Sequence, residues 1–132
     1  MKALFIGGTG TISSSISALC VSRGWDLTLL NRGNADARMP QGARAIHADI
    51  RDEAAVRDAL KGQAFDVVAD FIAYTPEDVA RDIRLFSGRT GQYFFISSAS
   101  AYQKPLSSPW TVSYTHLRAH RDRTRSRMPS SA

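Results

Sequence analysis

The sequence predicts an α/β fold built on a doubly wound parallel sheet. Short apolar runs recur along residues 1–111, and segments with helical periodicity separate them, as in successive β-α-β units. The run FDVVADFIAY at 65–74 is too continuously apolar for a half-exposed strand and suits a central strand covered on both faces. With 43% hydrophobic and 22% charged residues in a chain of 132, we expect one globular core.

The first half of the pattern begins with a strand at 2–6, KALFI, which runs into the turn GGTG. A helix is expected from about Thr11, and Gly24 is placed to end it. A second strand, WDLTLL, precedes the polar loop NRGNADARMPQG. The helix carries apolar residues at helical spacing, which we expect to face the core: Ile12, Ile16, Leu19 and Cys20.

In the second half, ARAIHAD at 43–49 predicts a short strand, and Asp52 could cap a helix running to about Lys61. After the apolar run, TPED supplies a second helix start, with Thr75 as N-cap and Pro76 at the first helical position. GQYFFISS predicts the fifth strand. Right-handed crossovers favour the strand order 3-2-1-4-5, with a ligand crevice between the first and fourth strands.

Composition excludes several classes of protein. No apolar stretch approaches the roughly 20 residues that cross a bilayer, and we expect neither a signal peptide nor a membrane partner. Cys20 is the only cysteine, which argues against a disulfide framework or a cysteine-rich metal site and fits a cytoplasmic location. We interpret Cys20 as a small core residue and His47 as a packed or half-exposed histidine, and we expect no metal site.

Basic charge is concentrated in residues 112–132. This segment has five arginines and one aspartate, a balance of 5 − 1 = +4, whereas the remaining 111 residues have 12 basic and 11 acidic side chains. VSYTHLRAH and SRMPSSA back-translate into codons resembling the two ends of a sequencing-library adapter, in the right order. We therefore expect 112–132 to be a non-native, disordered tail and not a specific nucleic-acid-binding arm, although five arginines would otherwise suit phosphate binding.

The segment GGTGTIS places Gly7, Gly10 and Ser13 at three-residue intervals between a strand and a helix. Glycine lets the chain turn tightly and lets backbone N–H groups approach a pyrophosphate, which the helix N-terminus favours. A merely structural turn is the alternative. Ser13 stands where a third glycine is usual, and its hydroxyl could bond to the turn or to phosphate.

Three segments, FIGGTGTIS, HADIRD and FFISSASAY, resemble in this order the extended or atypical short-chain dehydrogenase/reductase superfamily, in its NAD-dependent epimerase/dehydratase branch. The resemblance covers residues 1–111. It implies the N-terminal part of a Rossmann-like NAD(P)-binding domain, truncated after the fifth strand, with oligomers possible. It also implies a dinucleotide partner and, in the intact relative, a small-molecule substrate.

The same resemblance assigns residues to the cofactor, NADP or NAD. Asp49 and Ile50 would hold the adenine, although Asp49 could instead cap the next turn. Arg32, after Asn31, could pair with the 2′-phosphate of NADP, or be a solvated loop residue. The glycine turn and first helical turn would lie along the pyrophosphate through Gly7, Gly10, Thr11, Ile12 and Ser13.

Catalysis in the resembled family uses a serine, a tyrosine and a lysine, and Ser98 occupies the serine position. The Tyr-x-x-x-Lys pair is missing, because Tyr114 is followed four residues later by Arg118, which does not replace lysine. We predict part of an epimerase/dehydratase-type oxidoreductase for a sugar nucleotide or similar hydroxy/carbonyl substrate, inactive by itself. The alternative is a non-catalytic dinucleotide-binding redox sensor or an RNA-binding atypical relative.

Asp70 lies in an apolar run near the proposed crevice and is either a hydrogen-bonded buried acid or a cofactor contact.

The segment YFFIS would lie at an open edge of the truncated sheet. We therefore expect the expressed chain to be poorly soluble.

Overall fold

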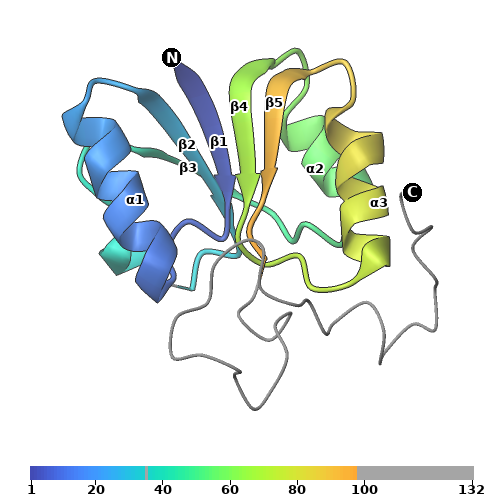
Figure 1. Cartoon of the computed structure of the whole chain (residues 1–132), viewed down its shortest axis with the longest axis horizontal. Helices are drawn as coiled ribbons and strands as arrows, with labels where there is room; N and C mark the ends of the chain where they lie inside the picture. Colours follow the sequence, from blue (N-terminus) through green and yellow to red (C-terminus); the bar gives the residue numbers. More distant parts are fainter. Residues whose placement is uncertain (35, 98–132) are drawn as a thin grey trace, which may run out of the picture. The chain divides into compact units, whose positions relative to one another are not determined.

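The computed structural model of the chain describes residues 1–34 and 36–97. A parallel sheet of five strands runs through this part of the chain in the order β3-β2-β1-β4-β5, which confirms the predicted topology (Figure 1). The strands are β1 (Lys2–Ile6), β2 (Asp26–Asn31), β3 (Arg44–His47), β4 (Phe65–Asp70) and β5 (Thr90–Phe95). The helices are α1 (Thr11–Ser22), the short 3-10 helix η1 (Asp36–Arg38), α2 (Glu53–Ala59) and α3 (Pro76–Phe86).

Helices cover both faces of the sheet, with α1 on one face and α2 and α3 on the other (Figure 1). Alternate residues of β1 supply the two cores: Leu4 and Ile6 pack with α2 and α3, whereas Ala3 and Phe5 pack on the α1 side. Both faces of this central strand are buried, which explains why its sequence is apolar throughout.

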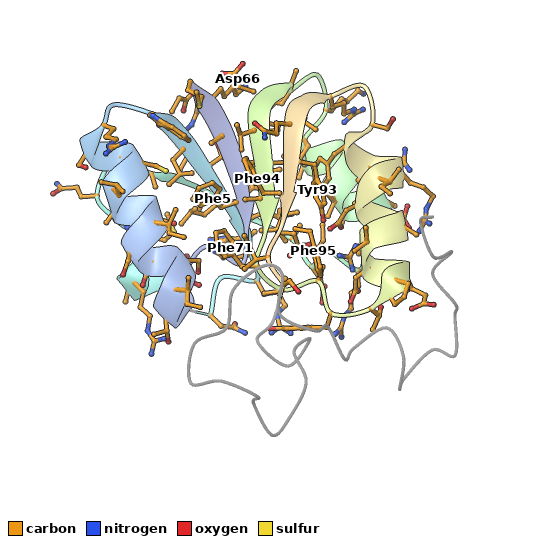
Figure 2. The ribbon with its side chains drawn as sticks, viewed as in Figure 1. Phe5, Asp66, Phe71, Tyr93, Phe94 and Phe95 are labelled. Atoms are coloured by element: carbon orange, nitrogen blue, oxygen red, sulfur yellow. The ribbon has the colours of Figure 1, made fainter. Side chains whose placement is uncertain are left out.

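The α1 face of the sheet is completed by an aromatic pair. The rings of Phe5 and Phe71 meet edge to face, with centroids 5.4 Å apart (Figure 2). On the opposite face Tyr93 of β5 is directed between the sheet and α3 (Figure 2).

The prediction that four apolar residues of α1 face the core was wrong for three of them. Ile12 is 67% exposed, Leu19 is 51% exposed and Ile16 is also exposed, whereas Ser13, Ser17 and Cys20 are buried. The buried face lies roughly 100° around the helix from the apolar stripe. Small side chains allow α1 to approach the sheet closely, and both serine hydroxyls donate to carbonyl oxygens of the glycine turn.

The predicted strand at 65–74 ends earlier, at Asp70. The Asp70 carboxylate accepts hydrogen bonds from the backbone N–H groups of Ile72 (2.6 Å) and Ala73 (2.9 Å), so the chain turns away from the sheet. Asp52 caps α2 and Thr75 caps α3, as predicted. Across residues 1–34 and 36–97, no helix has the length and hydropathy needed to cross a membrane.

Candidate functional site

A cavity of about 400 Å³ opens at the carboxyl ends of the strands. Parallel registers bring these ends together, since Ile6 of β1 pairs with Leu30 of β2 on one side and with Asp70 of β4 on the other. Four loops contribute to the lining: those after β1, β2, β3 and β4. The cavity therefore lies at the predicted crevice between the first and fourth strands, where doubly wound folds bind ligands.

The glycine turn after β1 leaves no room for a side chain at two of its positions. Gly7 has a φ of +79°, and a Cβ there would come within 2.5 Å of a side-chain methyl carbon of Ile72. A Cβ on Gly8 would come equally close to a methyl carbon of Leu29. The bare backbone of this turn, with Gly7 and Gly10 at the cavity wall, can approach a ligand closely.

Two serines of α1 hold the glycine turn from inside the protein. The Ser13 hydroxyl donates to the carbonyl oxygen of Gly7 (2.8 Å) and accepts from the backbone N–H of Gly10 (2.8 Å). Ser17, one helical turn later, donates to the carbonyl oxygen of Gly8 (3.1 Å). Of the two possibilities raised by the sequence, Ser13 bonds to the turn; it is buried beneath it and absent from the cavity lining.

The N-terminus of α1 follows this turn directly, with Gly10 as N-cap and Thr11 and Ile12 in the first two helical positions. Backbone N–H groups of a first helical turn have no intrahelical acceptor. No acidic side chain occupies this first turn. The helix end therefore carries uncompensated positive potential, which favours an anion.

The loop after β2 brings Asn31 and Arg32 to the cavity. The Asn31 side chain is occupied locally, because its amide oxygen accepts from the backbone N–H of Gly33 (2.7 Å). Arg32 is exposed and lines the cavity, and within the described residues no carboxylate oxygen lies within 4 Å of its guanidinium. Its position suits pairing with an anionic group of a ligand.

The segment after β3 places Asp49 and Ile50 side by side at the cavity. One Asp49 carboxylate oxygen accepts a hydrogen bond from the backbone N–H of Arg51 (3.0 Å). Asp49 therefore caps the following turn, which the sequence had raised as the alternative to a contact with adenine. Ile50 is buried in the core beneath α2 and α3 and still contributes to the lining. Both residues therefore lie at the cavity wall, Asp49 within a local turn and Ile50 within the core.

His47, at the end of β3, forms a half-exposed pair with Asp36 of η1, with 2.7 Å between Nε2 and the carboxylate. This placement agrees with the interpretation of a half-exposed histidine. Among residues 1–34 and 36–97, no group of three or more His, Cys, Asp or Glu side chains could hold a metal ion.

The wall opposite the glycine turn comes from the segment after β4 and from α3, through Ile72, Tyr74, Asp78 and Arg81. None of these four was predicted from the sequence as a site residue. Two features could have indicated them: Asp78 is the third residue after the N-cap Thr75, and Arg81 follows it at helical spacing.

Asp70 proves to be a fully buried, hydrogen-bonded acid and is absent from the cavity lining. Burial, followed by the interaction with Asp82, raises the pKa of Asp70 to about 7. Burial, followed by the hydrogen bond to Asp82, also raises the pKa of the Tyr93 phenol well above its usual range. By contrast, hydrogen bonds, first from the Tyr74 backbone N–H, lower the pKa of Asp78. The predicted catalytic residue, Ser98, lies outside the described residues.

Comparisons with known proteins agree with this geometry. The chain is 29% identical over 116 residues to the chloroplast stem-loop binding protein of 41 kDa b of Arabidopsis thaliana. The match covers 78% of this chain and 30% of that protein, so the chain spans about a third of the length of its relative.

Solved structures share the fold at low sequence identity. A dTDP-glucose 4,6-dehydratase from Bacillus anthracis str. Ames, in complex with NAD, has a TM-score of 0.71 at 12% identity, covering 89% of this chain and 44% of that one. A UDP-glucose 4-epimerase from Bifidobacterium longum, in complex with NAD+ and UDP, has a TM-score of 0.66 at 18% identity, covering 90% and 43%.

The family model of the NAD dependent epimerase/dehydratase family matches residues 3–88. The match contains the whole glycine turn, the segment after β3 and the opposite wall through α3. It spans more than half of the chain. This chain belongs to the NAD-dependent epimerase/dehydratase family.

Proposed function

We propose that residues 1–111 form the N-terminal part of the NAD(P)-binding domain of an epimerase/dehydratase-type oxidoreductase. The observation that carries this proposal is the glycine turn, whose bare backbone leads into the N-terminus of α1 at the edge of the cavity. A Cβ at Gly7 or Gly8 would collide with a neighbouring side chain, so the turn has to be bare at these positions. The first turn of α1 has no acidic side chain that would repel a bound pyrophosphate. These features fit a dinucleotide.

Each predicted residue has a proposed task. Backbone N–H groups at Thr11 and Ile12 bind the pyrophosphate, Gly7 and Gly10 line its path without side chains, and Ser13 keeps the turn in shape from behind. Asn31 shapes the loop that presents Arg32 to the adenosine ribose, where a guanidinium favours the 2′-phosphate of NADP over NAD. The adenine lies against Asp49 and Ile50. Bound NAD(P) would supply the redox chemistry, and these residues bind and orient it.

The substrate class we propose is a sugar nucleotide or a similar hydroxy/carbonyl compound. Support comes from the family match and from solved neighbours whose names include a UDP-glucose 4-epimerase and a dTDP-glucose 4,6-dehydratase. Ser98 would orient the reacting oxygen. We expect no turnover from the 132-residue chain, because its sequence lacks a Tyr-x-x-x-Lys pair.

Calorimetric titration of the 132-residue chain with NADP(H) and NAD(H) tests the cofactor assignment. Saturable binding that Gly10→Val abolishes supports it, because a branched side chain at the N-cap would cover the pyrophosphate path. Ser22→Val, at the far end of α1, serves as the control. No binding heat for any of the four dinucleotides would refute the proposal.

A second candidate function is recognition of an RNA stem-loop, favoured by the sequence match to the Arabidopsis stem-loop binding protein. Filter binding with a stem-loop RNA and a chain shortened to residues 1–111 tests it without the arginines of 112–132. Displacement of the RNA by NADP(H) would mean that both ligands use the same cavity, whereas binding that requires 112–132 would reject this candidate.

A further inference from the structure

The segment that forms the cavity wall opposite the glycine turn, residues 72–75, has an unusual hydrogen-bonding pattern. Its four consecutive backbone N–H groups all donate to carboxylates. Asp70 accepts from Ile72 and Ala73 at 2.6 and 2.9 Å, and Asp78 accepts from Tyr74 and Thr75 at 3.0 and 3.1 Å. We call residues 72–75 the carboxylate-bound wall.

One guanidinium joins the two carboxylates. Arg81 Nη1 donates to Asp78 Oδ1 (2.8 Å), and Arg81 Nη2 lies 3.5 Å from Asp70 Oδ2. Asp70 Oδ2 has no hydrogen-bond partner of its own, so Arg81 is the cation that faces this buried oxygen. The two ends of the wall are thus connected through a single side chain.

Arg81 is itself held on its other side. Its Nε and Nη2 donate to Asp82 Oδ1 at 3.0 and 2.8 Å, and Asp82 Oδ2 accepts from the Tyr93 hydroxyl at 2.6 Å. The arginine side chain is 8% exposed. This network ties β4, α3 and β5 together beneath the cavity, and the carboxylates of Asp78 and Asp82 accept the hydrogen bonds of the guanidinium.

The position of the wall matters for a ligand because Ile72 lies directly on the glycine turn. A Cβ at Gly7 would be 2.5 Å from Ile72 Cγ2, so Ile72 packs closely against the turn at the edge of the cavity. Tyr74, at 78% exposure, extends the wall outward. Any displacement of residues 72–75 therefore changes the packing of Ile72 on Gly7 and the shape of the cavity that both residues line.

We propose that Arg81 is a positioning residue for the dinucleotide: by bridging Asp70 and Asp78 it holds the carboxylate-bound wall at the distance from Gly7 that the cofactor requires. The proposal rests on the proposed function of this cavity. Arg81 acts through the wall and not as an anion-binding residue, because its donors are directed to carboxylates. Lysine could keep the charge but not the forked geometry that reaches both acids.

Amide hydrogen exchange at single-residue resolution tests the wall itself. In the 132-residue chain we expect the amides of residues 72–75 to be protected although they lie outside helix and strand. Arg81→Gln should accelerate their exchange by about tenfold or more, as expected for loss of charge-assisted hydrogen bonding. Arg84→Gln is the matched control, since Arg84 pairs with Glu53 from the exposed side of the same helix, and we expect a change below about twofold.

Asp78→Ala provides a test that does not depend on the folding of the Arg81 variant. It should accelerate exchange at Tyr74 and Thr75 and leave Ile72 and Ala73, which Asp70 holds, protected. Glu77→Ala, an exposed acid in the same helical turn, should change none of the four. Unprotected amides in the wild-type chain, or unchanged protection in Arg81→Gln, would overturn the proposal.

Cofactor titration completes the experiment. Arg81→Gln should raise the dissociation constant of whichever of NADP(H) and NAD(H) binds by about tenfold, Arg81→Lys should give an intermediate value, and Arg84→Gln should leave it unchanged. Faster exchange with unaltered affinity would overturn the positioning role. Absence of cofactor binding in the wild-type chain would instead refute the proposed function, while the exchange data would still decide whether Arg81 holds the wall.

Discussion

The Ser13 hydroxyl donates to the carbonyl oxygen of Gly7 over 2.8 Å and accepts the N–H of Gly10 over the same distance. A side chain that replaces the usual third glycine thus fastens both ends of the turn from within. Ser17 does the same for the carbonyl oxygen of Gly8. The buried face of α1, which has small side chains, therefore does two things: it packs closely against the sheet, and it maintains the shape of the glycine turn.

Ser13→Ala should destabilise the protein by about 1–3 kcal/mol, because it leaves a partly buried carbonyl oxygen and a backbone N–H without their partner. Urea unfolding measures the loss. Ser14→Ala, which removes an exposed hydroxyl one residue along the same helix, should change the free energy of unfolding by less than about 0.5 kcal/mol. Equal effects of the two substitutions would contradict the assigned role of Ser13.

Gly7→Ala should be more harmful than Gly24→Ala. Both glycines have positive φ, at +79° and +74°, so both substitutions carry backbone strain of about 1–2 kcal/mol. Only at Gly7 would the new Cβ also meet Ile72, whereas nothing lies within 4 Å at Gly24. We expect Ile72→Ala to relieve part of the Gly7→Ala loss in a double-mutant cycle measured by urea unfolding. Purely additive effects would show that the contact with Ile72 carries no cost.

Stability should fall as pH rises from about 4 to 7. The pKa of Asp70 is raised to about 7 in the folded protein, whereas an unfolded aspartate has a pKa of about 3.9. In this window the folded state binds more protons than the unfolded state, so raising the pH favours unfolding. The stability that protonation of Asp70 contributes is fully present below about pH 4 and is lost as pH rises through 7.

Asp70→Asn should flatten this pH dependence by an amount on the order of 2 kcal/mol while keeping an oxygen acceptor for the wall. The measurement is the free energy of unfolding in urea at a series of pH values. Asp58→Asn, on the exposed side of α2, is the control and should reproduce the wild-type slope. If the free energy of unfolding of Asp70→Asn changed with pH as steeply as that of the wild type, other groups would be responsible for the pH dependence.

Arg32→Gln should weaken NADP(H) binding by about tenfold to a hundredfold and leave NAD(H) binding nearly unchanged, because only the former presents a phosphate to the guanidinium. Arg38→Gln, in η1, removes the same charge away from the cavity and should affect both cofactors equally little. Calorimetric titration of each variant with both cofactors measures the selectivity. Parallel losses for both cofactors in Arg32→Gln would argue against 2′-phosphate recognition.

Much of the fold and part of the site follow from residues near one another in the chain. The caps at Asp52 and Thr75 depend on groups within three positions, and the glycine turn depends on what glycine permits between a strand and a helix. The apolar runs likewise predicted all five strands and their order. The caps and the turn follow from local contacts, whereas the strand order follows from the right-handed crossovers that parallel strands require.

By itself, then, the sequence determined the sheet, the strand order and the location of the cavity at the glycine turn. Only the tertiary structure decided which face of α1 is buried, because the fit of Ser13 and Ser17 against the turn outweighs the apolar stripe of Ile12, Ile16 and Leu19. It also decided the wall, since Arg81 meets Asp70 and the Asp82–Tyr93 pair only when β4, α3 and β5 pack together. Contacts between distant segments depend on burial and shape, which no short window of sequence contains.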